Sequence, residues 1–265
     1  DRRRRVRVLP LCALLTVLAC FDLQAQEEVK PPKIFTSEAV IEATMEGPWR
    51  TIEKNKESGD SWQGTFRFRS ANGQDVAIPI EIRTRGLTRK RVCDFPPLRI
   101  VFDKEAAKGT EFRGAGSLKL VTHCLGREAY QQYYVKEYLS YRIYNRVTDL
   151  SFRVQGLDVT YVDSERDGKS EQRFGFLIED PDDVAERNGL EKITIEEAKL
   201  SQLDPRTTVQ HAMFQYLIAN LDWSVLSGPG DRCCHNVRMA AAGVDQPPYY
   251  PLPYDLDSSG FVDTH

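Results

Sequence analysis

Hydrophobic and polar residues alternate along several short segments in the first half of the chain. Residues 65–69 alternate, Asn72-Gly73 follows, and residues 76–84 alternate again. A period of two places one set of side chains on one face of a strand, and Asn-Gly is a frequent hairpin turn. These segments predict a β-hairpin. Residues 97–102 and 117–122 are further strand candidates, so we expect a mostly antiparallel sheet.

A helical pattern follows this strand-rich part. Residues 127–146 carry a stripe of aromatic side chains, which predicts one long helix. The stripe consists of Tyr130, Tyr133, Tyr134, Tyr141 and Tyr144. Residues 151–163 and 172–180 then read as two strands around a polar turn.

Shorter helices are expected after Pro181, at residues 182–188 and 195–200. Asp204-Pro205 is a typical N-cap followed by proline, and it predicts a helix that ends near Leu221. We expect its apolar face to hold Val209, Met213, Tyr216, Leu217 and Leu221. Val237 and Met239 mark the start of a further strand.

The N-terminus has the pattern of an export signal. A run rich in arginine, residues 2–7, precedes an apolar stretch at residues 8–21 and a small-residue site ending at Ala25. This predicts a signal peptide over residues 1–25 and a periplasmic or secreted protein. A lipoprotein anchor at Cys20 is the alternative, and only that anchor would attach the protein to a membrane. Residues 26–60 read as a tether and an irregular entry segment.

Composition narrows the class of partner. The formal net charge is −3, and most of the clustered basic charge lies in the predicted signal peptide, so we expect no nucleic acid partner. Four cysteines remain after the signal: Cys93, Cys124, Cys233 and Cys234. Three pairings are open, of which Cys93–Cys124 is favoured because each cysteine flanks a neighbouring strand. A zinc site with His123 and His235 is an alternative, but the spacing typical of zinc ligands is absent.

Asp255 and Asp257 form the most distinctive polar motif, in Tyr254-Asp255-Leu256-Asp257-Ser258-Ser259-Gly260. In an extended segment, residues i and i+2 point to the same side, so both carboxylates can face one cation. Mg²⁺ favours one or two carboxylates together with phosphate oxygens and water. A solvated turn rich in Asp, Ser and Gly explains the same residues.

Lys119 and Glu137 are candidates for a buried ion pair. Lys119 lies between Leu118 and Leu120 in a predicted strand, so its side chain is on the opposite face from the leucines. Glu137 lies on the aromatic face of the long helix, where a carboxylate is costly unless it is paired. We therefore expect Lys119 to pair with Glu137. A solvent-facing Lys119 and a Glu137 at the edge of the stripe are the alternatives.

The order of these motifs resembles the CotH-type family of secretory, atypical kinases, which are distant relatives of protein kinases. The likeness covers about residues 80–262 and rests on a set of short motifs in this order. They are Arg83-Thr84-Arg85-Gly86, Ser117-Leu118-Lys119-Leu120, Lys136-Glu137-Tyr138-Leu139, residues 174–179, Asn220-Leu221-Asp222, His235-Asn236 and Tyr254-Asp255-Leu256-Asp257.

The resemblance implies an α+β, protein-kinase-like fold with two lobes. Residues 61–180 would form an N-lobe of antiparallel sheet and one long helix, and residues 181–265 a mainly helical C-lobe. The chain stops at His265 without a helical ending, so a C-terminal part of this fold is expected to be missing from the sequence.

The resemblance also implies site roles, with ATP and Mg²⁺ or Mn²⁺ as cofactors. Lys119, held by Glu137, would bind phosphate with Arg85 nearby, and Glu179 would mark the hinge beside the adenine. Asp222 would be the catalytic carboxylate. The metal ligands would be Asn236, Asp255 and Asp257.

Several departures from kinase motifs keep other functions open. The chain has neither the glycine-rich loop nor the His-Arg-Asp run of protein kinases, and Cys233-Cys234 is foreign to the family pattern. The first hypothesis is an exported kinase that phosphorylates a protein Ser/Thr or a small-molecule hydroxyl. The alternatives are a non-catalytic pseudokinase or envelope ligand-binding protein, and a metal-dependent hydrolase built on Asp222, Asp255 and Asp257. A periplasm poor in ATP would count against the kinase.

Overall fold

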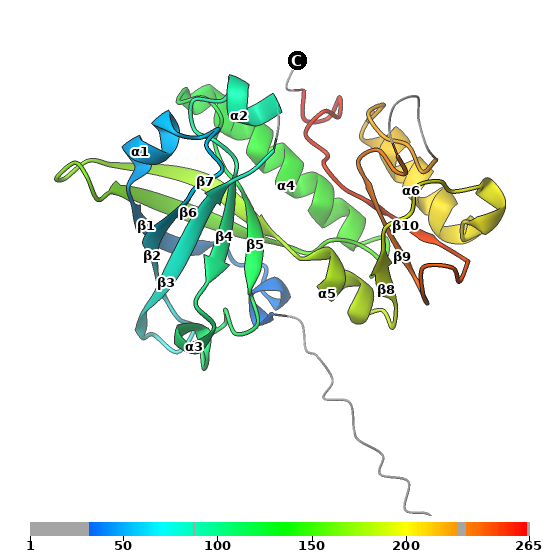
Figure 1. The fold of residues 1–265 in the computed structure, drawn as a ribbon, viewed down its shortest axis with the longest axis horizontal. Coiled ribbons are helices and arrows are strands. Elements are labelled where there is room, and N and C mark those ends of the chain that lie inside the picture. The colour runs from blue at the N-terminus through cyan, green and yellow to red at the C-terminus, as the bar shows by residue number, and fades with distance from the viewer. Residues whose placement is uncertain (1–31, 87, 227–231, 264–265) are drawn as a thin grey trace, which may run out of the picture.

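The computed structural model describes residues 32–86, 88–226 and 232–263 (Figure 1). Most of its strands form a closed barrel in the order β1-β2-β3-β4-β5-β7-β6. Their bounds are β1 (Ile41–Gly47), β2 (Ser61–Arg69), β3 (Asp75–Thr84), β4 (Leu98–Phe102), β5 (Ser117–Val121), β6 (Val154–Asp163) and β7 (Ser170–Ile178). Neighbouring strands are antiparallel except β1 and β6, which run parallel. The mostly antiparallel sheet and its first hairpin are therefore confirmed.

The barrel is closed by a strand that the sequence pattern did not reveal. Residues 26–60, expected to be a tether and an irregular segment, contain β1 and the helix α1 (Trp49–Lys54). On one side β1 pairs with β2, and on the other Ile41 and Ala43 lie opposite Leu157 and Val159 of β6. This pairing satisfies the backbone groups that would otherwise form two open sheet edges.

Alternation along the strands separates an apolar interior from an outer face that carries polar groups. Side chains inside the barrel form one buried cluster that includes Phe66, Ile80, Ile100, Leu118, Leu120 and Leu177. Because Lys119 lies between two of these residues, its side chain is on the outer face, as predicted.

One long helix, α4 (Gln131–Asn145), packs against the outer face of β7 and β6 (Figure 1). A short 3-10 helix, η2 (Glu128–Tyr130), precedes it, so the predicted helix is confirmed with a later start. Tyr134, Tyr141 and Tyr144 are its buried aromatic residues. The ring of Tyr144 lies 4.5 Å from that of Phe214, which joins α4 to the C-terminal part of the chain.

The C-terminal part combines short helices with a small sheet of order β10-β9-β8. Its strands are β8 (Glu191–Ile193), β9 (Val237–Ala241) and β10 (Tyr250–Pro253), and its helices are α5 (Pro181–Glu186), α6 (Pro205–Leu217) and the 3-10 helix η3 (Leu200–Gln202). The helix expected at residues 195–200 is not present. The other short helices of the described chain are η1 (Lys33–Thr36), α2 (Thr88–Val92) and α3 (Lys104–Ala107).

These observations overturn the predicted fold class. The chain is mostly a closed seven-stranded barrel with few helices, rather than a two-lobed kinase fold with a mainly helical C-lobe. The physical reason is the parallel β1–β6 pairing, which turns the expected open sheet into a barrel. In addition, the region after Pro181 contains a three-stranded sheet, of which only β9 was expected from the sequence.

One disulfide fastens α2 to the end of β5. Cys93 and Cys124 are bonded, with Cα atoms 4.5 Å apart, which is the pairing favoured from the sequence. The bond closes a loop of 31 residues. A loop of this length corresponds to a stabilisation of about 3–4 kcal/mol in the chain-entropy view.

The predicted export signal and the lipid anchor at Cys20 lie outside the described residues, so both stay predictions. None of the helices in the described ranges has the length and apolar character required to cross a bilayer.

Helix α6 presents apolar side chains to solvent. Asp204 caps the helix as predicted, with Oδ1 accepting a hydrogen bond from the backbone of Thr207. The residues expected on a core-facing surface are instead exposed, with Met213 at 64% and Leu221 at 95%. The inward face carries Phe214 and Ile218 together with buried polar groups.

Neighbouring substitutions on α6 test this orientation. We expect Met213→Ala to change the free energy of unfolding by less than about 0.5 kcal/mol, because surface changes are usually that small. Phe214→Ala should cost about 3–5 kcal/mol, because it leaves a cavity beside Tyr144. Denaturant unfolding of the two variants measures both values. Equal costs would contradict the described orientation of α6.

Candidate functional site

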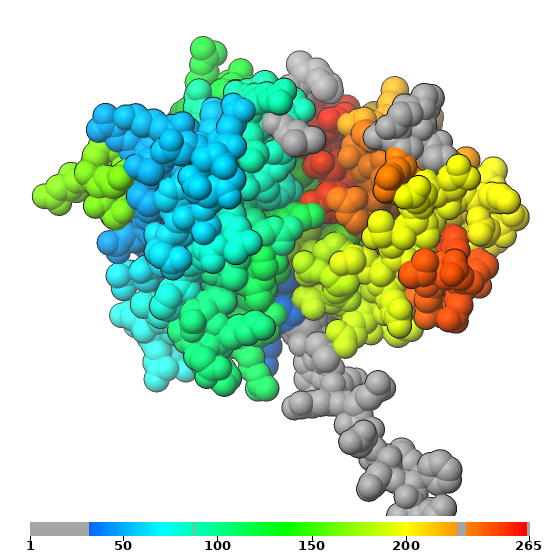
Figure 2. All heavy atoms as spheres, in the orientation of Figure 1, coloured from blue at the N-terminus to red at the C-terminus, as the bar shows by residue number. Residues whose placement is uncertain are grey.

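A polar cluster lies where the C-terminal segment meets the barrel. Beyond β10 the chain passes through Tyr254, Asp255 and Asp257. In the space-filling view, the red C-terminal segment lies in a hollow between the blue-to-green barrel and the yellow region of α6 (Figure 2). The predicted site residues of the barrel and of the C-terminal part can therefore face one another across this segment.

Tyr254 is the centre of the cluster. Its hydroxyl accepts hydrogen bonds from Lys119 of β5 and, at 3.2 Å, from Nη2 of Arg85 just beyond β3. The Lys119 amine also lies 4.0 Å from the centre of the Tyr254 ring, and the Arg238 guanidinium of β9 lies 4.3 Å from it. Three cations from three strands or strand ends thus converge on one phenol.

Burial, together with the surrounding cations, lowers the affinity of Lys119 for its proton. Burial is the largest cause, and the charges of Arg85, Arg238 and Arg99 add to it, so the pKa of Lys119 falls from 10.5 to about 7. Asp255 opposes this shift. An anion placed among these side chains would relieve the mutual repulsion of the cations, because opposite charges favour the protonated amine.

Glu137 of α4 is buried near charges of both signs, those of Asp257 and Asp255 and those of Arg89 and Arg85. Burial first, then the charges of Asp257 and Asp255, raises the pKa of Glu137 to about 8, against the opposing effect of Arg89 and Arg85. The predicted Lys119–Glu137 pair is not formed: in the ranges that the structure describes, no ion pair within 4.0 Å joins them. The reason is that Lys119 bonds to Tyr254 instead.

The loop after Tyr254 is held by contacts from two other elements. The Asp255 backbone is in the left-handed region, with φ of 59°, and its N–H donates to the hydroxyl of Tyr141 on α4 at 3.0 Å. Asp257 forms an ion pair with Arg89 of α2 at 3.3 Å. Burial and the neighbouring Asp255 raise the pKa of Asp257, so the two carboxylates lie close enough to repel each other.

Asp222 and Asn236 are brought together as the motif order suggested. The Asn236 amide donates to the backbone oxygen of Asp222 at 2.7 Å and to its Oδ2 at 2.9 Å. His235 Nε2 lies 2.8 Å from Oδ1 of the same carboxylate. The charge of Asp222 also contributes to the raised pKa of Asp257, so both carboxylates belong to one site.

A buried amide pair supports the Asp222 loop from α6. Oδ1 of Asn220 accepts a hydrogen bond from the backbone of Asp222 at 2.9 Å, and its amide donates to Oε1 of Gln215 at 2.9 Å. Asn220 and Gln215 are both buried. They therefore fix the backbone of Asp222 while its carboxylate stays about half exposed.

Glu179 has a structural position outside this cluster. Both oxygens of its buried carboxylate are bonded by Arg187 of α5, at 2.9 and 3.0 Å. The backbone N–H of Arg153 donates to Oε2 at 3.0 Å. These bonds join β7 to α5 and occupy the side chain that the sequence had suggested for cofactor binding.

The donor set suits a cation that arrives with its own oxygen ligands. Asp255 and Asp257 supply two hard carboxylates that lie close to each other, and Asn236 bonds to the neighbouring Asp222 through its amide nitrogen. Over the described ranges, no group of three or more His, Cys, Asp or Glu side chains is placed to hold a metal. The residues thus fit Mg²⁺ or Mn²⁺ bound together with phosphate oxygens and water, and do not form a complete protein cage.

A cavity of about 340 Å³ adjoins the cluster through Arg238. Its lining is mainly apolar and includes Pro181, Ile193, Val237, Met239 and the bonded pair Cys233 and Cys234. This volume and lining are typical of small-ligand pockets. A larger groove, of about 530 Å³, lies on the outside of the barrel and holds none of the cluster residues.

Sequence reasoning missed three residues of the cluster: Arg238, Arg89 and the phenol of Tyr254. Two signals could have found them. Arg238 stands two positions after Asn236 in the predicted strand, and Tyr254 directly precedes the Asp motif. Arg89 had no comparable signal, because the Cys93–Cys124 disulfide helps to place α2 beside Asp257.

Comparison with known proteins adds no family to this description. No protein-family model matches the chain, and no curated protein sequence matches it significantly.

The Lys119 environment yields a direct prediction. We expect acylation of the Lys119 amine, followed by mass spectrometry, to show a midpoint near pH 7. Arg238→Gln should move the midpoint upward, because it removes one of the charges that lower the pKa. Arg113→Gln, at an exposed position outside the cluster, should leave it unchanged. A midpoint near that of a free lysine in the unsubstituted protein would contradict the described burial.

Proposed function

We propose that the protein is a phosphotransferase that uses ATP with Mg²⁺ or Mn²⁺ and phosphorylates a hydroxyl group of a protein or small molecule. The observation that carries this proposal is the convergence of Arg85, Lys119 and Arg238 directly beside Asp255 and Asp257. Phosphoryl transfer depends mainly on positioning and charge stabilisation, which need such cations together with metal-binding carboxylates.

Each part of the cluster has a role in this proposal. Arg85 and Lys119 bind phosphate oxygens, because neither cation has a carboxylate partner within ion-pair distance in the described part of the chain. A bound Mg²⁺ or Mn²⁺ would neutralise charge on the phosphates, and Asp255, Asp257 and the amide oxygen of Asn236 would hold it. Asp222, about half exposed, orients the acceptor hydroxyl and is itself aligned by His235 and Asn236.

The mainly apolar cavity beside Arg238 supports a nucleotide rather than inorganic phosphate as the donor. Val237 and Met239 line this cavity from β9, and Arg238 of the same strand faces Tyr254 on the other side. A base in the cavity would thus be connected to phosphates at the three cations.

The described ligand set disfavours a two-metal hydrolase. Such a site requires further His, Asp or Glu ligands around Asp222, Asp255 and Asp257. The described residues offer no group of three that could hold a metal. Glu137 is buried near the two C-terminal aspartates, and it has no cationic partner within 4.0 Å among those residues.

Thermal unfolding with and without ATP and Mg²⁺ tests the proposal. At about 100 times the dissociation constant, ligand binding adds about 2.7 kcal/mol, which corresponds to a rise in Tm on the order of 5 °C for a chain of this size. Lys119→Gln should weaken ATP binding about tenfold, because it removes a charge-assisted contact to phosphate. Asp255→Asn should remove the additional effect of the metal while keeping a residue that tolerates the left-handed backbone.

Two matched variants serve as controls. Lys104→Gln and Asp245→Asn change exposed residues of the same types outside the cluster and should leave the shift intact. Release of ADP by the unsubstituted protein with a hydroxyl-rich acceptor extract, lost in Asp222→Asn, would support transfer. Absence of any nucleotide effect would refute the proposal and favour the non-catalytic ligand-binding alternative.

A further inference from the structure

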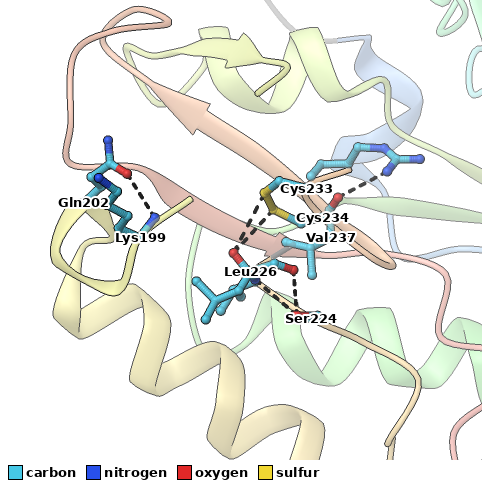
Figure 3. The surroundings of a disulfide bond; sticks show 9 residues. Lys199, Gln202, Ser224, Leu226, Cys233, Cys234 and Val237 are labelled. Atoms are coloured by element: carbon cyan, nitrogen blue, oxygen red, sulfur yellow. Dashed lines mark hydrogen bonds between the residues drawn. A yellow bond between two sulfur atoms is a disulfide. The ribbon is translucent and has the colours of Figure 1, made fainter. Parts of the chain in front are cut away.

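Cys233 and Cys234 form a disulfide in the wall of the cavity beside Arg238 (Figure 3). Both residues are partly exposed, and their sulfur atoms lie 3.9 and 3.4 Å from the backbone oxygen of Val225. The backbone N–H of Cys233 donates to the oxygen of Glu196 at 2.8 Å. The pair is thus part of an ordered wall that a small molecule in the cavity would touch.

This disulfide differs from Cys93–Cys124 in what it can do for stability. In the chain-entropy view, stabilisation by a disulfide grows with the length of the loop that it closes. Cys93 and Cys124 are 31 residues apart, whereas Cys233 and Cys234 are adjacent. A bond between neighbours restricts very little of the unfolded chain, so stabilisation does not account for it.

The two disulfides also differ in access. In the first bond Cys93 is completely buried and Cys124 is partly exposed. By contrast, both Cys233 and Cys234 are partly exposed, and both line a cavity. Thiol–disulfide exchange requires approach of a thiolate to sulfur, and exposed disulfides are the more readily reduced.

We propose that Cys233–Cys234 is a thiol–disulfide exchange site for small thiols, and that its state controls ligand binding in the adjoining cavity. A thiolate attacks one sulfur, the S–S bond breaks, and the leaving sulfur takes up a proton. A second thiolate then attacks the mixed disulfide, releasing the oxidised small thiol and leaving two cysteine thiols. Two electrons thus pass from two small thiols to the protein.

The disulfide is connected to the polar cluster through His235 and Asn236, the next two residues in the chain. His235 and Asn236 hold Asp222, and the backbone oxygen of His235 accepts a hydrogen bond from Ser224 at 3.0 Å. Opening the disulfide frees the two residues directly before them. The oxidised protein should therefore have the more ordered cavity wall and bind a nucleotide more tightly than the reduced protein, because preorganisation reduces the entropy lost on binding. This second part rests on the proposed nucleotide function.

Alkylation followed by mass spectrometry tests the exchange site without reference to nucleotides. The native protein is incubated with glutathione at increasing ratios of reduced to oxidised form and is then treated with iodoacetamide. We expect Cys233 and Cys234 to be labelled at ratios at which Cys93 and Cys124 remain bonded. Opening of Cys93–Cys124 first, or resistance of both bonds until the protein unfolds, would overturn the proposal.

Binding of ATP with Mg²⁺ to the oxidised and reduced forms tests the second part. We expect reduction to weaken binding about fivefold or more, within the usual range of coupling between sites. The Cys233→Ser/Cys234→Ser variant should bind like the reduced form and be indifferent to glutathione. Equal affinities in both states would overturn the coupling. Selective labelling without nucleotide binding in either state would refute the proposed function while supporting the exchange site.

Discussion

The contact on which the candidate site depends is the packing of Lys119 and Arg238 against the Tyr254 ring. Lys119 belongs to the barrel and Arg238 to the small C-terminal sheet, so one phenol joins the two parts of the molecule. The same residue leads directly into Asp255 and Asp257. The position of the carboxylates relative to the cations is therefore set by how Tyr254 is packed. Its hydroxyl also occupies a position among the cations that suits an anionic oxygen.

Local structure was largely predictable from the sequence, whereas the architecture was not. The β2–β3 hairpin, the helix α4 and the Asp204 cap follow from alternation, an aromatic stripe and capping chemistry, all of which act over a few residues. Closure of the barrel depends on Ile41 and Ala43 meeting Leu157 and Val159, more than a hundred residues away. Nothing in the polar composition of residues 26–60 signals that pairing, so the inferred kinase-like fold was wrong.

The candidate site was also only partly predictable from the sequence. Asp222 and Asn236 lie together as the order of motifs suggested, although they are separated by a loop. Asp255 and Asp257 were expected in an extended segment, whereas Asp255 has a left-handed backbone with φ of 59° and the two carboxylates are nevertheless close. The Lys119–Glu137 pair was not formed, because the partly buried Lys119 amine bonds to the Tyr254 hydroxyl instead. Likewise Glu179 was expected at a cofactor but is used by Arg187 to join β7 to α5. A pattern identifies polar residues that need partners, but packing decides which partners they find.

The central claim is the proposal that a metal would bind at Asp255, Asp257 and Asn236 only together with phosphate oxygens, which would complete its shell. Electron paramagnetic resonance of Mn²⁺ measures this directly, because the signal of the free ion is lost on binding. The account predicts weak Mn²⁺ binding to the protein alone and tight binding, of one or two ions, when ATP is present. Two results would contradict the account. One is tight Mn²⁺ binding to the protein without a nucleotide; the other is that protein with ATP binds no more Mn²⁺ than ATP alone.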